Sequence, residues 1–196
     1  YIRWGRNSCP ASSNQIYRGY MAGSAYFAEG GGANYQCLTT DPEYDSKSYT
    51  LRYATAPIRP MQYEIGAGPN MFGSGLLYEY VPCVACETEQ RITQVTIPGA
   101  TRCPSSDWTL DYQGYIMSEI LTGYESHHVS GRGRGSFVCI DSKAEKCPPP
   151  MKSVGQWNGG VLYPVSVDCW SDIGSPLLPC PPYRNNTALS CVVCSK

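Results

Sequence analysis

Hydrophobic and polar side chains alternate in short runs along the chain, and the three-to-four-residue spacing of an amphipathic helix is weak throughout. The runs that predict strands are 1–8, 16–27, 51–63, 76–81, 91–97, 108–121 and 161–167. Prolines inside 51–63 and 161–167 are typical of edge or broken strands. The run 108–121 fits a strand or a short helix, and its front part is expected to be strand. The pattern predicts a mainly β fold.

Polar or glycine-rich segments separate these runs and predict loops. They are 40–50, 66–75, 122–136 and 170–190, and Pro98-Gly99 predicts a turn. The run 91–97 connects the two halves of the chain and alternates too regularly for a flexible linker. We therefore expect the halves to pack against each other.

A frame of cysteines, glycine and tyrosines occurs twice in the same order. The first copy comprises Cys9-Pro10, Tyr17-Arg18-Gly19-Tyr20, Cys37-Leu38 and Cys83-Val84-Ala85-Cys86. The second comprises Cys103-Pro104, Tyr112-Gln113-Gly114-Tyr115, Cys139-Ile140 and Cys191-Val192-Val193-Cys194. Agreement over four ordered features predicts an internal duplication. The predicted architecture is two disulfide-stapled β half-domains, 1–96 and 97–196, related by pseudo-twofold symmetry within one compact unit.

Composition narrows the function classes. The net charge is −1 and charged residues make up 16% of the chain, so no basic surface for nucleic acid is expected. A weakly charged surface favours self-association. The 16 tyrosines, against 3 phenylalanines, suit interfaces, where an apolar ring with a polar tip is favoured. No run of 18 apolar residues is present, so no membrane insertion is expected.

Eleven cysteines among abundant proline, glycine and tyrosine indicate an oxidised, secreted protein. Two alternatives are a four-thiolate zinc site, made by the two C-x-x-C pairs Cys83, Cys86, Cys191 and Cys194, and a redox-active C-x-x-C. An odd count leaves one thiol over. Cys147 lies outside both copies and is the candidate for a free thiol or an interchain bridge, unless it pairs with Cys169 or Cys180. Asn185-Asn186-Thr187 is a glycosylation sequon at Asn185.

Several stretches together resemble a known family. YIRWGRNSCP, IYRGYMAG, GGGANYQCL, VPCVAC, IPGATRCPSSDWTLDYQGYIM, FVCID, CPPY and LSCVVCSK are similar to the globular C-terminal region of the sponge short-chain, or spongin-type, collagens. More distantly, the repeat is similar to the non-collagenous C-terminal domain of type IV collagen, a duplicated and disulfide-stapled β structure. The chain itself holds no Gly-X-Y repeat, so it cannot form a triple helix.

This resemblance implies a disulfide pattern. The implied pairs are Cys9–Cys86, Cys37–Cys83, Cys103–Cys194, Cys139–Cys191 and Cys169–Cys180. Cys147 remains unpaired in that scheme. The expected partners are further copies of the chain, with collagen or other matrix proteins, a mineral or glycans as further candidates.

Few residues suggest site chemistry. The loop residues Ser126, His127, His128, Ser130, Arg132, Arg134 and Ser136 gather hydroxyl, imidazole and guanidinium groups that could bind silica or sulfated glycans. The alternating acids Asp41, Glu43 and Asp45 could bind calcium weakly, although such loops are more often simply solvated. No nucleophile elbow, phosphate loop or zinc-protease motif occurs, so no enzyme activity and no cofactor are expected.

The sequence therefore predicts a secreted structural module of the extracellular matrix. Tyrosine-rich, weakly charged surfaces and unpaired strand edges would assemble it into homo-oligomers or filaments. One alternative is a scaffold associated with a biomineral such as silica. Another is a lectin, in which tyrosine and tryptophan rings stack on sugars.

Overall fold

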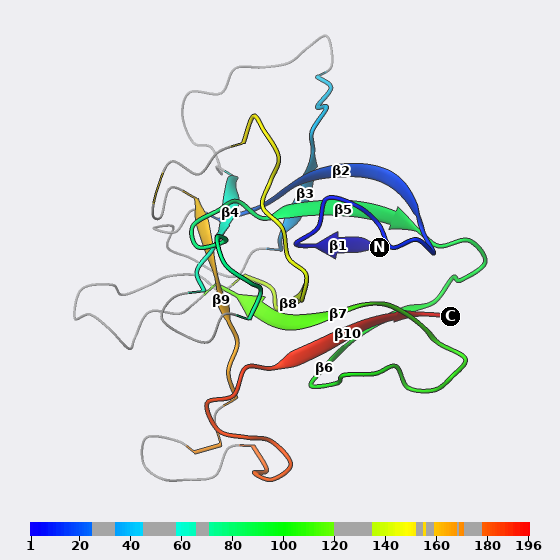
Figure 1. The fold of residues 1–196 in the computed structure, drawn as a ribbon, viewed down its shortest axis with the longest axis vertical. Helices are drawn as coiled ribbons and strands as arrows, with labels where there is room; N and C mark the ends of the chain where they lie inside the picture. The colour runs from blue at the N-terminus through cyan, green and yellow to red at the C-terminus, as the bar shows by residue number, and fades with distance from the viewer. Residues whose placement is uncertain are drawn as a thin grey trace.

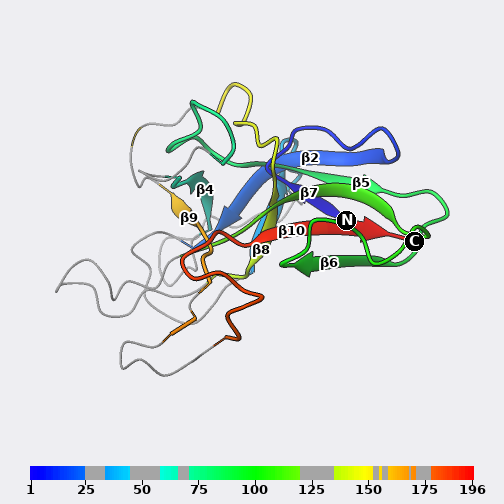
Figure 2. The same cartoon turned by 60° about the horizontal axis from the view of Figure 1, so that its bottom comes forward.

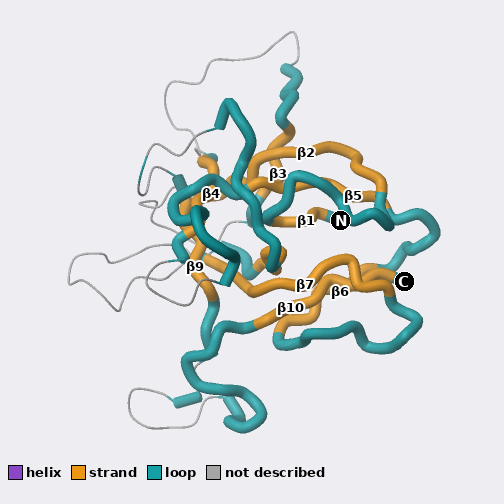
Figure 3. The backbone as a smooth tube through the Cα atoms, viewed as in Figure 1, coloured by secondary structure: helices purple, strands orange, loops and turns teal. Residues whose placement is uncertain are grey.

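A computed structural model describes residues 1–24, 34–44, 58–65, 71–119, 135–151, 155, 159–167, 169–170 and 178–196. This part of the chain forms strands and loops without a helix, as the alternation pattern predicted (Figure 3). The strands are β1 (Ile2–Trp4), β2 (Asn14–Gly23), β3 (Gln36–Thr39), β4 (Arg59–Tyr63), β5 (Pro82–Glu87), β6 (Gln94–Pro98), β7 (Thr109–Ser118), β8 (Val138–Asp141), β9 (Gly160–Pro164) and β10 (Ser190–Ser195).

All of these strands belong to one mixed sheet. The order is β6-β10-β7-β8-β1-β5-β2-β4-β9, with β3 beside β2 and an additional pairing of β7 with β9. Most neighbours are antiparallel, while β1–β8 and β4–β9 are parallel. In Figure 1 the group β1, β2, β5 lies above the group β6, β7, β10, and both chain ends lie on the same side.

The strands form two sets with the same internal pairing. The first set runs β1-β5-β2-β3 and the second runs β6-β10-β7-β8. The first strand of one set meets the last strand of the other where β1 pairs with β8. This corrects the expected pseudo-twofold relation, because a twofold axis that paired β1 with β8 would also pair β6 with β3. No such pairing exists among the described strands, so the two sets follow each other head to tail.

The Y-x-G-Y motif has the same local role in both sets. Tyr17 donates its hydroxyl to the Cys37 carbonyl, and Tyr112 donates to the Cys139 carbonyl, each at 3.1 Å. A Cβ on Gly114 would collide with the backbone carbonyl of the neighbouring strand β8, and Gly19 stands in the same relation to β3. Glycine is required here because two backbones approach closely.

The main apolar core lies between the two halves. Met21, Met61 and Tyr63 from the first half pack with Met117 and other residues of the second half, and all four are fully buried. A smaller core around Tyr112 lies within the second half. The linker is anchored as well, because Arg91 donates to the Ser195 hydroxyl at 2.8 Å.

Several local predictions need correction. Residues 76–81 do not form the expected strand, because Glu79 N–H bonds back to the Leu76 carbonyl in a turn and Tyr78 adopts a φ of 59°. Only Tyr80 makes an isolated antiparallel bridge, with Gln62. The run 108–121 is the exception, because its expected front strand is confirmed as β7, while residues 120 and 121 lie outside the described residues. The run 91–97 becomes strand only from Gln94, and the boundary at residue 96 falls inside β6, which pairs along its length with β10.

Candidate assembly surfaces

Five disulfides staple the sheet, and they are the five pairs that the resemblance implies. They are Cys9–Cys86, Cys37–Cys83, Cys103–Cys194, Cys139–Cys191 and Cys169–Cys180. Each C-x-x-C lies within a strand, β5 or β10, so its two cysteines point to opposite faces of the sheet. All four C-x-x-C sulfurs are therefore bonded to other cysteines, which overturns the zinc and dithiol alternatives.

Cys147 is free and buried, with 6% of its surface exposed. Its N–H donates to the Tyr80 carbonyl at 3.0 Å, which holds it against the first half. Burial raises the pKa of its thiol to about 12, so the reactive thiolate is scarce at neutral pH. Its pairing with Cys169 or Cys180 is excluded because these two are bonded to each other. An interchain bridge would first require this buried sulfur to become exposed.

The other predicted site residues fall into two groups. Asn185 is exposed, and its side-chain oxygen accepts a hydrogen bond from Cys169 N–H at 2.9 Å, which leaves the amide nitrogen for a glycan. The patch Ser126, His127, His128, Ser130, Arg132 and Arg134 lies outside the described residues, as does Asp45. Asp41 and Glu43 are exposed, and no group of three potential metal ligands occurs in the described ranges.

A buried ion pair lies at the junction between β1 and β8. Arg3 contacts one carboxylate oxygen of Asp141 through Nε at 2.8 Å and through Nη2 at 2.7 Å. The two side chains are 11% and 3% exposed. The guanidinium carbon of Arg3 also lies 5.8 Å from the centre of the Tyr112 ring. Beside this pair, Trp4 is the register partner of Ile140 in the parallel ladder.

A loop from the second half extends the same junction. Glu145 N–H donates to the Gly5 carbonyl at 2.8 Å. The Glu145 carboxylate accepts bonds from Asn7 N and Asn7 Nδ2 at 3.0 and 2.9 Å, and it pairs with Arg6 at 3.0 Å. Tyr63 donates its hydroxyl to the Glu145 carbonyl at 2.7 Å, and burial raises the pKa of that hydroxyl well above its ordinary value. Cysteine spacing did not indicate these residues.

In each set, one outermost strand has an edge that pairs with none of the other described strands. In the first set this strand is β3, and in the second it is β6, which lies beyond β10 (Figure 2). Leu38 on β3 is 40% exposed, and Pro98 on β6 is also exposed. Unpaired strand edges are templates for pairing with another chain. These two edges are therefore the candidate assembly surfaces.

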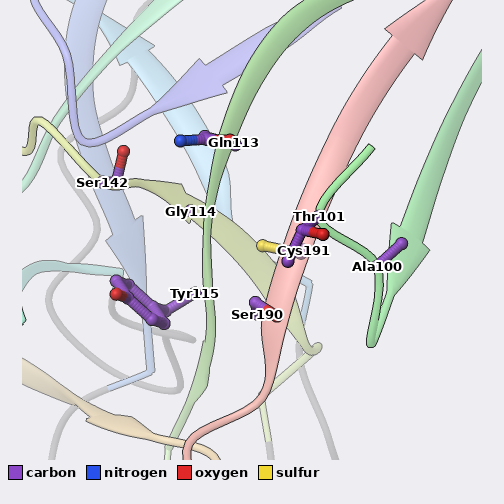
Figure 4. Close-up of a pocket in the computed structure, with 8 residues that line it drawn as sticks. All are labelled: Ala100, Thr101, Gln113, Gly114, Tyr115, Ser142, Ser190 and Cys191. Atoms are coloured by element: carbon purple, nitrogen blue, oxygen red, sulfur yellow. The ribbon is translucent and has the colours of Figure 1, made fainter. Parts of the chain in front are cut away.

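A small pocket of about 120 Å³ lies between β7, β10 and the turn after β6 (Figure 4). Its lining is mostly polar or small and includes Thr101, Gln113, Tyr115, Ser142 and Ser190. Hydroxyl and amide groups beside an aromatic ring can bind a small polar ligand.

No model of a known protein family matches the chain. The described part contains no helix long and apolar enough to cross a membrane. The five disulfides indicate an oxidising compartment.

Proposed function

We propose that the protein is a secreted structural module of the extracellular matrix whose activity is self-assembly into oligomers or filaments. One observation carries the proposal: the described sheet has an unpaired edge strand at β3 and another at β6, each on the outer side of its set. Proteins that remain monomeric usually block such edges with very short strands, proline, charge, bulges or covering segments. Here the edge strands contain no charged residue, β3 has four residues, and the one proline lies at the end of β6, at Pro98.

The two sets of strands support an origin by duplication. They share the order of pairing, the Tyr-to-carbonyl hydrogen bonds and a bulge at the same position, at Ile16 in β2 and at Asp111 in β7. The motifs that resemble the sponge short-chain collagens lie in both copies. Duplicated, disulfide-stapled modules of that kind belong to extracellular matrices, and collagen or other matrix proteins are the proposed neighbours of the assembly.

The experiment is a measurement of native mass by light scattering across a hundredfold range of protein concentration. The disulfide-intact chain should form a species heavier than one chain, and its mass should rise with concentration by mass action. A sample with Cys147→Ser is the matched control, because it separates noncovalent assembly from an interchain disulfide. A chain that remains monomeric over the whole range would refute the proposal.

A second candidate is carbohydrate binding at the pocket of Figure 4, whose lining includes Tyr115, Gln113 and Ser142. Sugars are bound by hydrogen bonds to such groups and by stacking on aromatic rings. Binding on a glycan array that Gln113→Ala abolishes would support a lectin. Array signals unchanged by this substitution would exclude the pocket as the site.

The biomineral scaffold remains a proposal that rests on sequence, since its loop lies outside the described residues. Replacing His127 and His128 with alanine should reduce silica deposition and leave the native mass unchanged. Deposition that is equal in the variant and the original chain would exclude these histidines.

A further inference from the structure

We propose that copies of the chain join head to tail, with β3 of one copy pairing in parallel with β6 of the next. This junction would repeat the β1–β8 junction that joins the two halves inside one chain. The proposal presupposes the self-assembly proposed above and specifies the surfaces that carry it.

The strand registers define which positions correspond. Trp4 lies opposite Cys83 in the first set, and Pro98 lies opposite the equivalent Cys191 in the second. Ile140 lies opposite Tyr115, and Leu38 lies opposite the equivalent Tyr20. Within the chain Trp4 pairs with Ile140. The corresponding pair between two copies is Pro98 of one with Leu38 of the other.

The exposure of corresponding residues shows what such a junction would cover. Ile140 is fully buried against the first half, whereas its counterpart Leu38 is 40% exposed. A second pair behaves in the same way. Leu162 is fully buried, whereas Ile58 is 48% exposed. The two positions correspond because Leu162 lies two residues before Pro164, which pairs with β7, and Ile58 lies two residues before Pro60, which pairs with β2. Two exposed apolar side chains thus occupy positions that the other half buries in the core.

The backbone groups on both edges are oriented for this pairing. Thr40 N–H bonds to Arg18 on β2, so alternation directs the amides of Cys37 and Thr39 outward. Gly99 N–H bonds to Ser190 on β10, so the carbonyls of Thr96 and Pro98 also point outward. Cys37 and Thr39 N–H can then donate to the Thr96 and Pro98 carbonyls of the next copy.

Proline lacks the N–H that its counterpart Trp4 has, and the edge compensates for this. The acceptor for that N–H would be the Cys37 carbonyl. This carbonyl already accepts the Tyr17 hydroxyl at 3.1 Å, so no acceptor is left without a partner when Pro98 lies beside it.

The loops that follow the edges correspond as well. Glu43 lies six residues after Cys37, as Glu145 lies six residues after Cys139. Glu145 binds Asn7, which lies two residues after Gly5. The residue in the corresponding position, two residues after Gly99, is Thr101. The turn glycines Gly5 and Gly99 have similar φ values of 85° and 80°. Glu43 is exposed and can accept from the Thr101 N–H and hydroxyl of the next copy.

The junction between copies and the β1–β8 junction differ in charge, and this difference predicts how the junction between copies responds to salt. The counterparts of Arg3 and Asp141 are Ile97 and Thr39, so the junction between copies lacks the buried ion pair. It should therefore depend on apolar contacts and hydrogen bonds, with no ion pair for salt to screen. Because two different surfaces meet, the contact is heterologous, and it produces a closed ring or an open filament according to the rotation between copies.

The test blocks one edge at a time. Leu38→Lys places a charge on the β3 surface, and Pro98→Lys places one on the β6 surface. Each variant alone should require at least tenfold more protein than the original chain to reach the same mean mass. Mixed together, they should form a dimer of one copy of each, through the unmodified β6 of the first and the unmodified β3 of the second.

Ile16→Lys is the matched control, because Ile16 is also an exposed apolar residue, 64% exposed, on a strand of the same sheet. It should assemble like the original chain. Near-ultraviolet circular dichroism and the urea midpoint of every variant should match those of the original chain, since all three positions are exposed.

The outcomes separate the two proposals. If the original chain assembles and both edge variants assemble equally well, the head-to-tail pairing is wrong and self-assembly stands. If only one edge matters and mixing restores nothing, like surfaces pair with like and the heterologous junction is wrong. If the original chain stays monomeric, both proposals fail.

Discussion

Asp141→Asn removes the negative charge at the β1–β8 junction and leaves Arg3 buried beside a neutral amide. The side chains of the pair are 11% and 3% exposed, so water can replace little of the lost attraction. Breaking a buried ion pair by removing one partner costs about 3 to 5 kcal/mol. Arg3 keeps its bond to the Ser8 carbonyl at 2.8 Å and its contact with the Tyr112 ring, which places the expected loss near 3 kcal/mol.

Urea unfolding with all disulfides intact measures this loss. With a slope of about 1 to 3 kcal/mol per molar urea, a loss of about 3 kcal/mol lowers the midpoint by about 1 to 3 M. The matched control is a double-mutant cycle with Arg3→Met. The double variant should lose less stability than the sum of the losses of the two single variants, because it contains neither charge and therefore no unpaired buried charge.

Two results would refute this reasoning. A loss below about 1 kcal/mol for Asp141→Asn would mean that the pair behaves like an exposed surface pair. Additive losses in the cycle would mean that Arg3 and Asp141 stabilise the junction independently. In either case the ion pair would not explain why the second half stays fixed on the first.

Three further predictions concern single groups. Burial raises the pKa of Glu119 to about 7, above the 4.5 of an exposed glutamate, so folding favours its protonated form and stability should fall as pH rises from about 4.5 to 7. Urea midpoints should show this decline, and Glu119→Gln should remove that part of it; an unchanged pH profile would contradict the assignment. Cys147 should resist a thiol reagent in the native protein and react as one thiol per chain in urea, so rapid native labelling would contradict its burial. Removing the bridge Cys169–Cys180 by paired serine substitutions should cost about 3 kcal/mol in the chain-entropy model, since the loop it closes spans 11 residues. Urea unfolding checks the loss, and no loss would show that this segment is held by other contacts.

The sequence by itself determined the β class and the two strand sets. Alternating side chains predicted strands at β1, β2, β7 and β9, because burying one face of a sheet imposes a period of two. The repeated cysteine frame identified the cysteines that the two halves share, and the resemblance to the sponge short-chain collagens implied how they pair. The frame also contained β3 and β8 without revealing them as strands, because four residues are too few for alternation to be recognised.

Only the tertiary structure decided how the halves meet. Arg3 and Asn7 are far in the chain from Asp141 and Glu145, and the contacts between them depend on a parallel junction between strands that cysteine spacing does not encode. Residues 76–81 alternate like a strand, yet Leu76 is needed in the core and Tyr78 turns the backbone there. The relation between the two strand sets was also decided by packing. A repeated cysteine frame fits a twofold or a head-to-tail arrangement equally well, and only the strand edge that each half buries distinguishes the two arrangements.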